Sequence, residues 1–176
     1  MRKTIGCLIA CLLLGAFAAA QMGPPTPAPE LKKLDYFVGT WTLDGDMKPG
    51  PFGPGGKMTE TEKVEWMQGN FFLVIHSDFK SAMGNGMGMA YMGYNPEDKV
   101  YTYDAFNSMG EAEHSKGTLS GDTWTWTSED KMGGKIMKGR FTIKELSATS
   151  YSFKFEMAGE DGNYASMMEG KATKAN

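Results

Sequence analysis

The stretch 121-GDTWTWTSED-130 alternates large aromatic residues with small polar ones. Trp124 and Trp126 fall on one side of an extended chain, and the threonines between them fall on the other. Alternation with a period of two is typical of a β-strand that buries one face and exposes the other. The stretch 151-YSFKFEM-157 repeats the pattern with aromatic residues at every second position. These stretches predict an all-β protein.

Turn-forming residues divide the rest of the chain into short segments, as at Asn95-Pro96-Glu97-Asp98 and Ser108-Met109-Gly110. Turns at such regular spacing are typical of an antiparallel meander. Ten strands are predicted, at residues 38–46, 58–67, 70–80, 87–94, 99–106, 112–119, 122–129, 135–144, 150–157 and 164–172. An open meander would leave two unpaired edges, so we predict a single closed, antiparallel up-and-down β-barrel.

The amino terminus has the pattern of a secretory signal peptide. Arg2 and Lys3 precede an apolar stretch at residues 5–17, and small residues follow at 18–20. We therefore expect residues 1–20 to be cleaved near Ala20 and the protein to be exported, to the periplasm or outside the cell. The apolar stretch is too short to span a bilayer, so no stable membrane insertion is expected.

Both cysteines of the chain, Cys7 and Cys11, lie within the expected signal peptide. The segment that ends at Cys11 resembles a bacterial lipobox, but it lies early in the apolar stretch, so cleavage near Ala20 is preferred. The processed chain would contain no disulfide, no thiolate metal site and no cysteine nucleophile.

Residues 21–30 are rich in proline and predict an extended leader. Leu31, Leu34 and Phe37 then have the spacing of a short amphipathic helix. The barrel domain is expected to comprise residues 31–176.

The start of the first predicted strand, Gly39-Thr40-Trp41, resembles the Gly-x-Trp opening of lipocalins and other calycins. The resemblance implies that Trp41 is buried at the closed end of the barrel, beneath the helix. Lipocalins place an arginine of the last strand over this tryptophan. The nearest basic residue of the predicted last strand here is Lys171.

The segment 92-MGYNPEDKVYTYDAFNSMGEAEHSKGTLSGDTWTWTSE-129 resembles a bacterial family known as domain of unknown function 1579. Members share a Gly-Tyr-Asn/Asp turn, an aromatic strand, a Ser-Met-Gly turn and a Gly-x-Leu segment, in this order. The resemblance runs from about Leu31 to Lys171. It implies a lipocalin-like barrel with no established activity.

The formal net charge of −3 and the scattered basic residues argue against nucleic acid as a partner. No Gly-x-Ser-x-Gly or His-x-x-x-His motif is present, and His76 and His114 are the only histidines. A single histidine could ligate haem iron, but an ordinary strand residue is the preferred interpretation. We therefore predict no catalytic residue, no metal ligand and no cofactor, and we favour a protein that is not an enzyme. No oligomeric state is predicted.

Acidic residues alternate with threonine and lysine on two predicted strands. Glu60, Glu62 and Glu65 lie on the second strand, and Glu111 and Glu113 lie on the sixth. Carboxylates that share a face can perform acid–base chemistry, but this alternation on barrel strands is typical of a solvent-facing side. We interpret these residues as surface groups.

The stretch 81-SAMGNGMGMAYMGY-94 is rich in methionine and glycine. Methionine sulfur is a ligand for Cu(I), and methionine is also an adaptable apolar filler. No histidine lies in this stretch and methionines occur throughout the chain, so the filling role is favoured. Met87, Met89 and Tyr91 share one strand face, and Met92 and Tyr94 share the other. We predict that the face of Met87, Met89 and Tyr91 points inward.

Together these patterns predict that a small apolar molecule binds inside the barrel. The predicted lining residues are Phe71, Leu73, Met87, Met89, Tyr91, Tyr103, Trp124, Trp126, Phe153 and Phe155. Three alternatives stay open: a solidly packed structural or interaction barrel, Met-based Cu(I) binding, and an uncharacterised enzyme.

Overall fold

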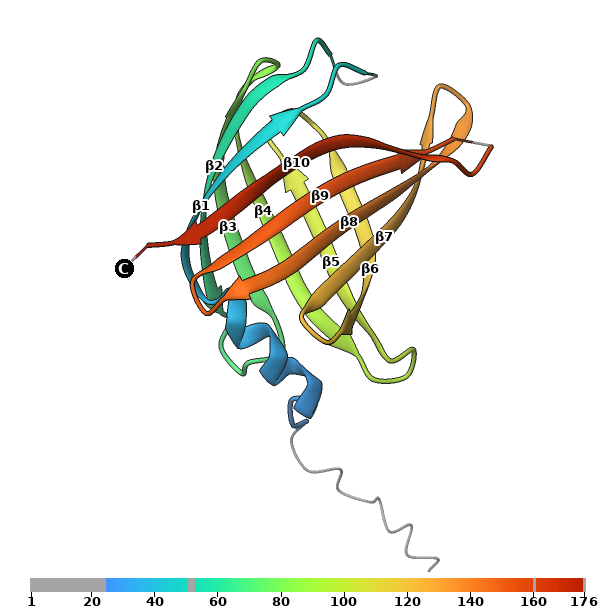
Figure 1. Ribbon diagram of the computed structural model, residues 1–176. Helices are drawn as coiled ribbons and strands as arrows, with labels where there is room; N and C mark the ends of the chain where they lie inside the picture. The colour runs from blue at the N-terminus through green and yellow to red at the C-terminus, as the bar shows by residue number, and fades with distance from the viewer. Residues whose placement is uncertain (1–24, 51–52, 160, 176) are drawn as a thin grey trace, which may run out of the picture.

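A computed structural model describes residues 25–50, 53–159 and 161–175 of the chain. The expected signal peptide, residues 1–20, lies outside the described residues. Ten antiparallel strands form one closed barrel in which sequence neighbours pair and β1 pairs with β10 (Figure 1). Their bounds are β1 Gly39–Met47, β2 Gly56–Trp66, β3 Leu73–Ser81, β4 Gly84–Asn95, β5 Val100–Asn107, β6 Ala112–Ser120, β7 Thr123–Met132, β8 Lys135–Ser147, β9 Ser150–Ala158 and β10 Tyr164–Lys174. The predicted fold class is confirmed.

One short helix covers an end of the barrel (Figure 1). It is a 3₁₀-helix, η1, at Pro29–Phe37, with a proline in its first turn, where no intrahelical N–H donor is needed. It buries Leu31, Leu34 and Phe37, the residues whose spacing predicted a helix. The helix begins at Pro29, so it includes the last two residues of the range 21–30 that was predicted as a leader. Among the described residues, none of the helices is long and apolar enough to cross a membrane.

Trp41 is completely buried beneath η1, as predicted. Its indole Nε1 donates a hydrogen bond of 2.7 Å to the carbonyl oxygen of Phe37. The ammonium group of Lys174 lies 4.9 Å from the centroid of the indole ring and donates to the carbonyl oxygen of Tyr36. Lys174, and not Lys171 of the predicted last strand, is therefore the cation over Trp41. The reason is that β10 extends beyond the predicted strand to Lys174, whereas Lys171 is exposed.

The core fills the helix end of the barrel. Trp124 and Trp126 both point inward from β7, as their alternation predicted, and their rings are stacked with centroids 6.1 Å apart. Trp124 also makes an edge contact with Phe37 of η1. Gly117 of the neighbouring strand β6 lies beside Trp126. A Cβ atom at this position would lie 2.5 Å from the indole ring, so only glycine leaves enough space for it. Aromatic packing thus closes the barrel at this end.

Candidate functional site

The opposite half of the barrel is hollow. A cavity of about 580 Å³, called the outer chamber here, reaches the barrel end away from η1 and is open to solvent there. Turn and strand-end residues such as Met47, Met83 and Glu111 line its mouth. A second cavity of about 160 Å³, the inner chamber, extends towards Phe37 of η1. The residues that line both chambers are Glu60, Glu62, Ile75, Tyr103, Glu113 and Met168. The two chambers therefore adjoin near the middle of the barrel.

The inner chamber is lined mainly by apolar and aromatic side chains. Trp126, Phe141 and Phe153 come from the adjacent strands β7, β8 and β9, and Met58 and Met92 come from β2 and β4. The rings of Phe141 and Phe153 are stacked with centroids 5.8 Å apart. These walls suit an apolar or aromatic group.

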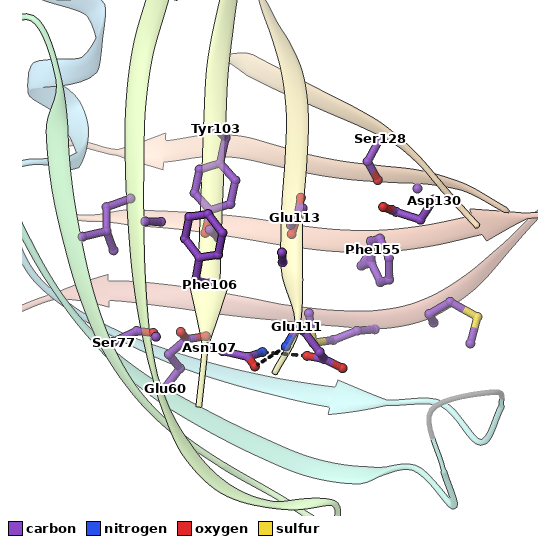
Figure 2. A pocket seen from close by; sticks show the side chains of 18 of the residues that line it. Glu60, Ser77, Tyr103, Phe106, Asn107, Glu111, Glu113, Ser128, Asp130 and Phe155 are labelled. Carbon is purple, nitrogen blue, oxygen red and sulfur yellow. Dashed lines mark hydrogen bonds between the residues drawn. The ribbon is translucent and has the colours of Figure 1, made fainter. Parts of the chain in front are cut away.

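Carboxyl groups lie where the two chambers meet. Glu60 and Glu62 point inward from β2, and Glu113 points inward from β6; we call these residues the carboxyl belt. Asp130 of β7 lines the outer chamber (Figure 2). The interpretation of Glu60, Glu62 and Glu113 as surface groups is wrong, because the closed sheet places their strand faces inside.

A sequence signal for this orientation was present on β2. Met58 and Val64 are buried, and Glu60 and Glu62 lie between them at every second position of the strand. Residues that differ by even numbers on one strand face the same way. The apolar residues at both ends of the series therefore predict that the two carboxylates between them point inward.

Burial changes the protonation of the belt. It raises the pKa of Glu62 from its usual 4.5 to about 8, and the neighbouring carboxyl of Glu60 adds to the effect. Burial also raises the pKa of Glu60, although a hydrogen bond from Ser77 opposes the shift. Glu113 keeps accessible surface towards the open chamber, yet the surrounding protein raises its pKa too, with a contribution from Asp130.

Hydroxyl groups lie beside the belt carboxyls. Ser115 Oγ donates a hydrogen bond of 2.5 Å to Glu113 Oε1. Tyr103 of β5 lines both chambers, and burial, with help from the belt carboxyls, raises the pKa of its hydroxyl well above the usual value. Tyr103 therefore stays protonated and can donate a hydrogen bond to a ligand.

The other acidic residues of the sequence analysis lie outside this belt. Glu65 pairs with Lys63 at 2.9 Å on the outer face of β2, as predicted for a surface group. Glu111 precedes β6 and accepts a hydrogen bond of 2.6 Å from Asn107 Nδ2 at the mouth of the outer chamber (Figure 2). It therefore does not share a strand face with Glu113.

Both histidines lie on the outer surface of the barrel. His76 is exposed on β3, and His114 Nδ1 lies 2.6 Å from Asp104 Oδ1 on the neighbouring strand β5. Within residues 25–50, 53–159 and 161–175, no three His, Cys, Asp or Glu side chains are grouped closely enough to hold a metal ion.

The predicted lining residues divide between the cavities and other places. Those on β5, β7 and β9 that border a cavity are Tyr103, Trp126, Phe153 and Phe155. Leu73 and Trp124 are completely buried in the core at the helix end. Phe71 lies before β3, which begins at Leu73 because Gly69 and Asn70 both have positive φ and form a turn. Whether any of these residues binds a ligand stays a prediction.

The orientation predicted for Met87, Met89 and Tyr91 is wrong. Met87 is 63% exposed and Met89 is 40% exposed, whereas Ala90 and Met92 are buried. Met89 nevertheless borders the outer chamber, as do its neighbours Gly88 and Ala90. The hydroxyl of Tyr91 donates to Met89 Sδ at 3.3 Å, on the same outer face.

The reason for this orientation lies on the neighbouring strand β3. A Cβ atom at Gly88 would lie 2.7 Å from Ser77 Oγ, and one at Gly86 would clash with the ring of Phe79. The inward side chains of β3 therefore occupy the space beside β4. Only the small residues of β4 fit on that side, so its long methionines point outward.

Comparison with protein-family models identifies the family of this chain. A model described as "Protein of unknown function (DUF1579)" matches residues 26–174. The chain belongs to the DUF1579 family. The crystal structure of Rv2717c from M. tuberculosis is similar to this DUF1579 chain, with a TM-score of 0.58 and 14% sequence identity over 85% of this chain and 99% of that chain. At this identity the similarity shows the barrel fold alone. No curated protein matches the sequence.

Proposed function

We propose that this DUF1579 barrel binds a small organic molecule in its interior. The observation that carries the proposal is the outer chamber, whose volume of about 580 Å³ is within the usual range of ligand sites, roughly 300–1,000 Å³. Side chains in a solidly packed barrel would fill this space, because protein interiors are close-packed. The open end supplies an entry path.

The inner chamber supports a ligand with an apolar part. Its volume of about 160 Å³ is close to that of an apolar cavity that binds benzene, about 150 Å³. Trp126 and Phe153 lie on its wall. The ligand then places an aromatic ring or a short aliphatic group there, and the rest of the molecule lies in the outer chamber.

Filling the outer chamber tests the proposal. Ala105 lies on β5 opposite buried Ala90 of β4 and lines the chamber. Ala105→Phe adds a ring inside the barrel, and we expect it to weaken binding of the neutral fluorophore N-phenyl-1-naphthylamine at least tenfold, which is about 1.4 kcal/mol. Fluorescence titration measures the affinity.

A matched control places the same ring on the outer surface. Thr118 is exposed on β6, so Thr118→Phe should leave the affinity of the fluorophore unchanged. Circular dichroism confirms that both variants fold. If the folded Ala105→Phe protein binds the fluorophore as tightly as the wild type, the proposed function is wrong.

We also propose that the protein is exported. The pattern of residues 1–20 supports this compartment. We expect the intact mass of the protein purified from its native cells to correspond to a chain that begins at Gln21. A mass that includes the first twenty residues, or a diacylated chain that begins at Cys11, would contradict this expectation.

A further inference from the structure

We propose that the ligand of this barrel is an organic cation, an ammonium group on an aromatic or short aliphatic body, with the ammonium held at the carboxyl belt. This inference rests on the proposed function, and it names the class of molecule that the two chambers accept.

The belt carboxyls come from two different walls of the cavity. Glu60 and Glu62 lie on β2, and Glu113 lies on β6, with β3, β4 and β5 between these strands in the closed barrel. Asp130 adds a further carboxyl on β7, next to β6. A group at the junction of the chambers therefore has carboxyl groups on two different walls.

The belt carboxyls have no cationic partner inside the barrel. In the described part of the chain, none of the ion pairs includes Glu60, Glu62 or Glu113. Two lysines line the outer chamber, and both lie at its mouth: Lys48 directly follows β1, and Lys131 lies near the end of β7. Lys48 forms an ion pair with Glu169 at 3.2 Å. A buried carboxylate without a partner is costly, and a bound cation removes that cost.

The walls beside the belt also suit a cation with an aromatic body. The rings of Tyr103 and Trp126 lie 5.9 Å apart, and both border the inner chamber. Aromatic faces attract an ammonium group through the ring quadrupole, and they pack against an apolar body. A ligand whose ring fills the inner chamber places an ammonium one or two carbons away at the belt.

A metal ion suits the belt less well than an organic cation. Divalent cations need several oxygen ligands converging within about 2–2.6 Å of one point. The acidic groups of the described residues are not grouped in that way. An ammonium group instead binds through hydrogen bonds to single carboxyl groups and needs no such convergence.

Calorimetric titration at pH 8 with probes of matched shape tests this inference. The probes are 2-phenylethylamine, 2-phenylethanol and 3-phenylpropanoate, which carry a cationic, a neutral and an anionic group on a phenyl-alkyl body. We expect the amine to bind at least tenfold more tightly than the alcohol, and the carboxylate to bind most weakly. Equal affinities, or a preference for the alcohol or carboxylate, would overturn the inference.

Variants of the belt locate the cation. The double variant Glu60→Gln/Glu62→Gln keeps the side-chain shape and removes the charge, so it should weaken amine binding at least tenfold and leave alcohol binding unchanged. The matched control is Glu65→Gln, which removes an outward-facing carboxylate of the same strand and should change neither affinity. Unchanged amine binding by the folded double variant would overturn the inference.

Proton release gives an independent measurement. The interior groups that face Glu62 are Glu60, Glu113, Asp130, Tyr103 and Tyr151. A bound ammonium favours the ionised form of Glu62 and lowers its pKa from about 8, so amine binding near pH 7 should release protons. The observed binding enthalpy should then depend on the ionisation enthalpy of the buffer. Amine binding without proton release would contradict a position at the belt.

The outcomes separate the two proposals. If N-phenyl-1-naphthylamine binds in the barrel but the amine has no advantage over the alcohol, the proposed function stands and the cationic ligand is rejected. If none of these probes binds, the proposed function itself is rejected.

Discussion

Replacing Trp41 with alanine is expected to lower the free energy of unfolding by about 3–5 kcal/mol, the range for a large aromatic side chain removed from a core. The indole is completely buried between η1 and the barrel. The substitution removes its hydrogen bond to the Phe37 carbonyl and the ring beneath the Lys174 ammonium. It also leaves a cavity beside Tyr151, whose ring centroid lies 4.9 Å from that of Trp41. Urea denaturation followed by circular dichroism measures the change.

Trp66 offers a matched control at the same end of the barrel. It is only partly buried, and its Nε1 donates to Asp35 Oδ1 at 2.9 Å. Trp66→Ala should therefore cost less than half as much as Trp41→Ala. A loss of less than about 1 kcal/mol for Trp41→Ala would show that the indole does not hold the helix on the barrel.

The stability of the wild-type protein is expected to fall as the pH rises from 5 to 9. The folded protein holds a proton on Glu62 up to a pKa of about 8, whereas the unfolded chain loses it near the usual 4.5. Between these values the folded state binds more protons, so the free energy of unfolding decreases with pH. With a discount for the solvent that reaches the open cavity, the loss from Glu62 is on the order of 2–3 kcal/mol.

Glu62→Gln removes this titration. We expect the variant to match the wild type near pH 4, where Glu62 is protonated in both states, and to be more stable than the wild type at pH 9. Removing the charge also relieves its repulsion with Glu60. Urea denaturation at several pH values measures both proteins. Glu65 has the opposite response, because Lys63 lowers its pKa, so Glu65→Gln should not flatten the profile. A wild-type protein that is more stable at pH 9 than at pH 5 would contradict the prediction.

The local sequence determined the strands and their order. Alternation in residues 121–130 and 151–157 reflects the geometry of an extended chain, in which successive side chains point to opposite faces. Turn residues at short intervals allowed only antiparallel neighbours, and a long meander avoids free edges by closing. The helix spacing of Leu31, Leu34 and Phe37 and the burial of Trp41 were predictable for the same reason, since each depends on neighbouring residues.

Only the tertiary structure decided which face of a strand points inward where both faces carry apolar residues. On β4, Met87 and Met89 are as apolar as Met92, so alternation alone permits either orientation. The choice depends on Ser77 and Phe79 of β3, whose side chains leave room for glycine and not for methionine. These contacts join residues on separate strands, and no local pattern contains them.

The hollow interior also required the tertiary structure. A filled barrel and a hollow barrel have the same alternation of apolar and polar residues, because the pattern records the face of a side chain and not the distance to the opposite wall. The same limit hid Glu113, whereas Met58 and Val64 on the same strand face as Glu60 and Glu62 were a readable signal for those two residues. Glu60, Glu62 and Glu113 have the polarity of surface residues, and an accessible cavity provides a place inside the barrel where such groups retain solvent. The cavity exists only because the ten strands close into a barrel, and no single strand encodes it.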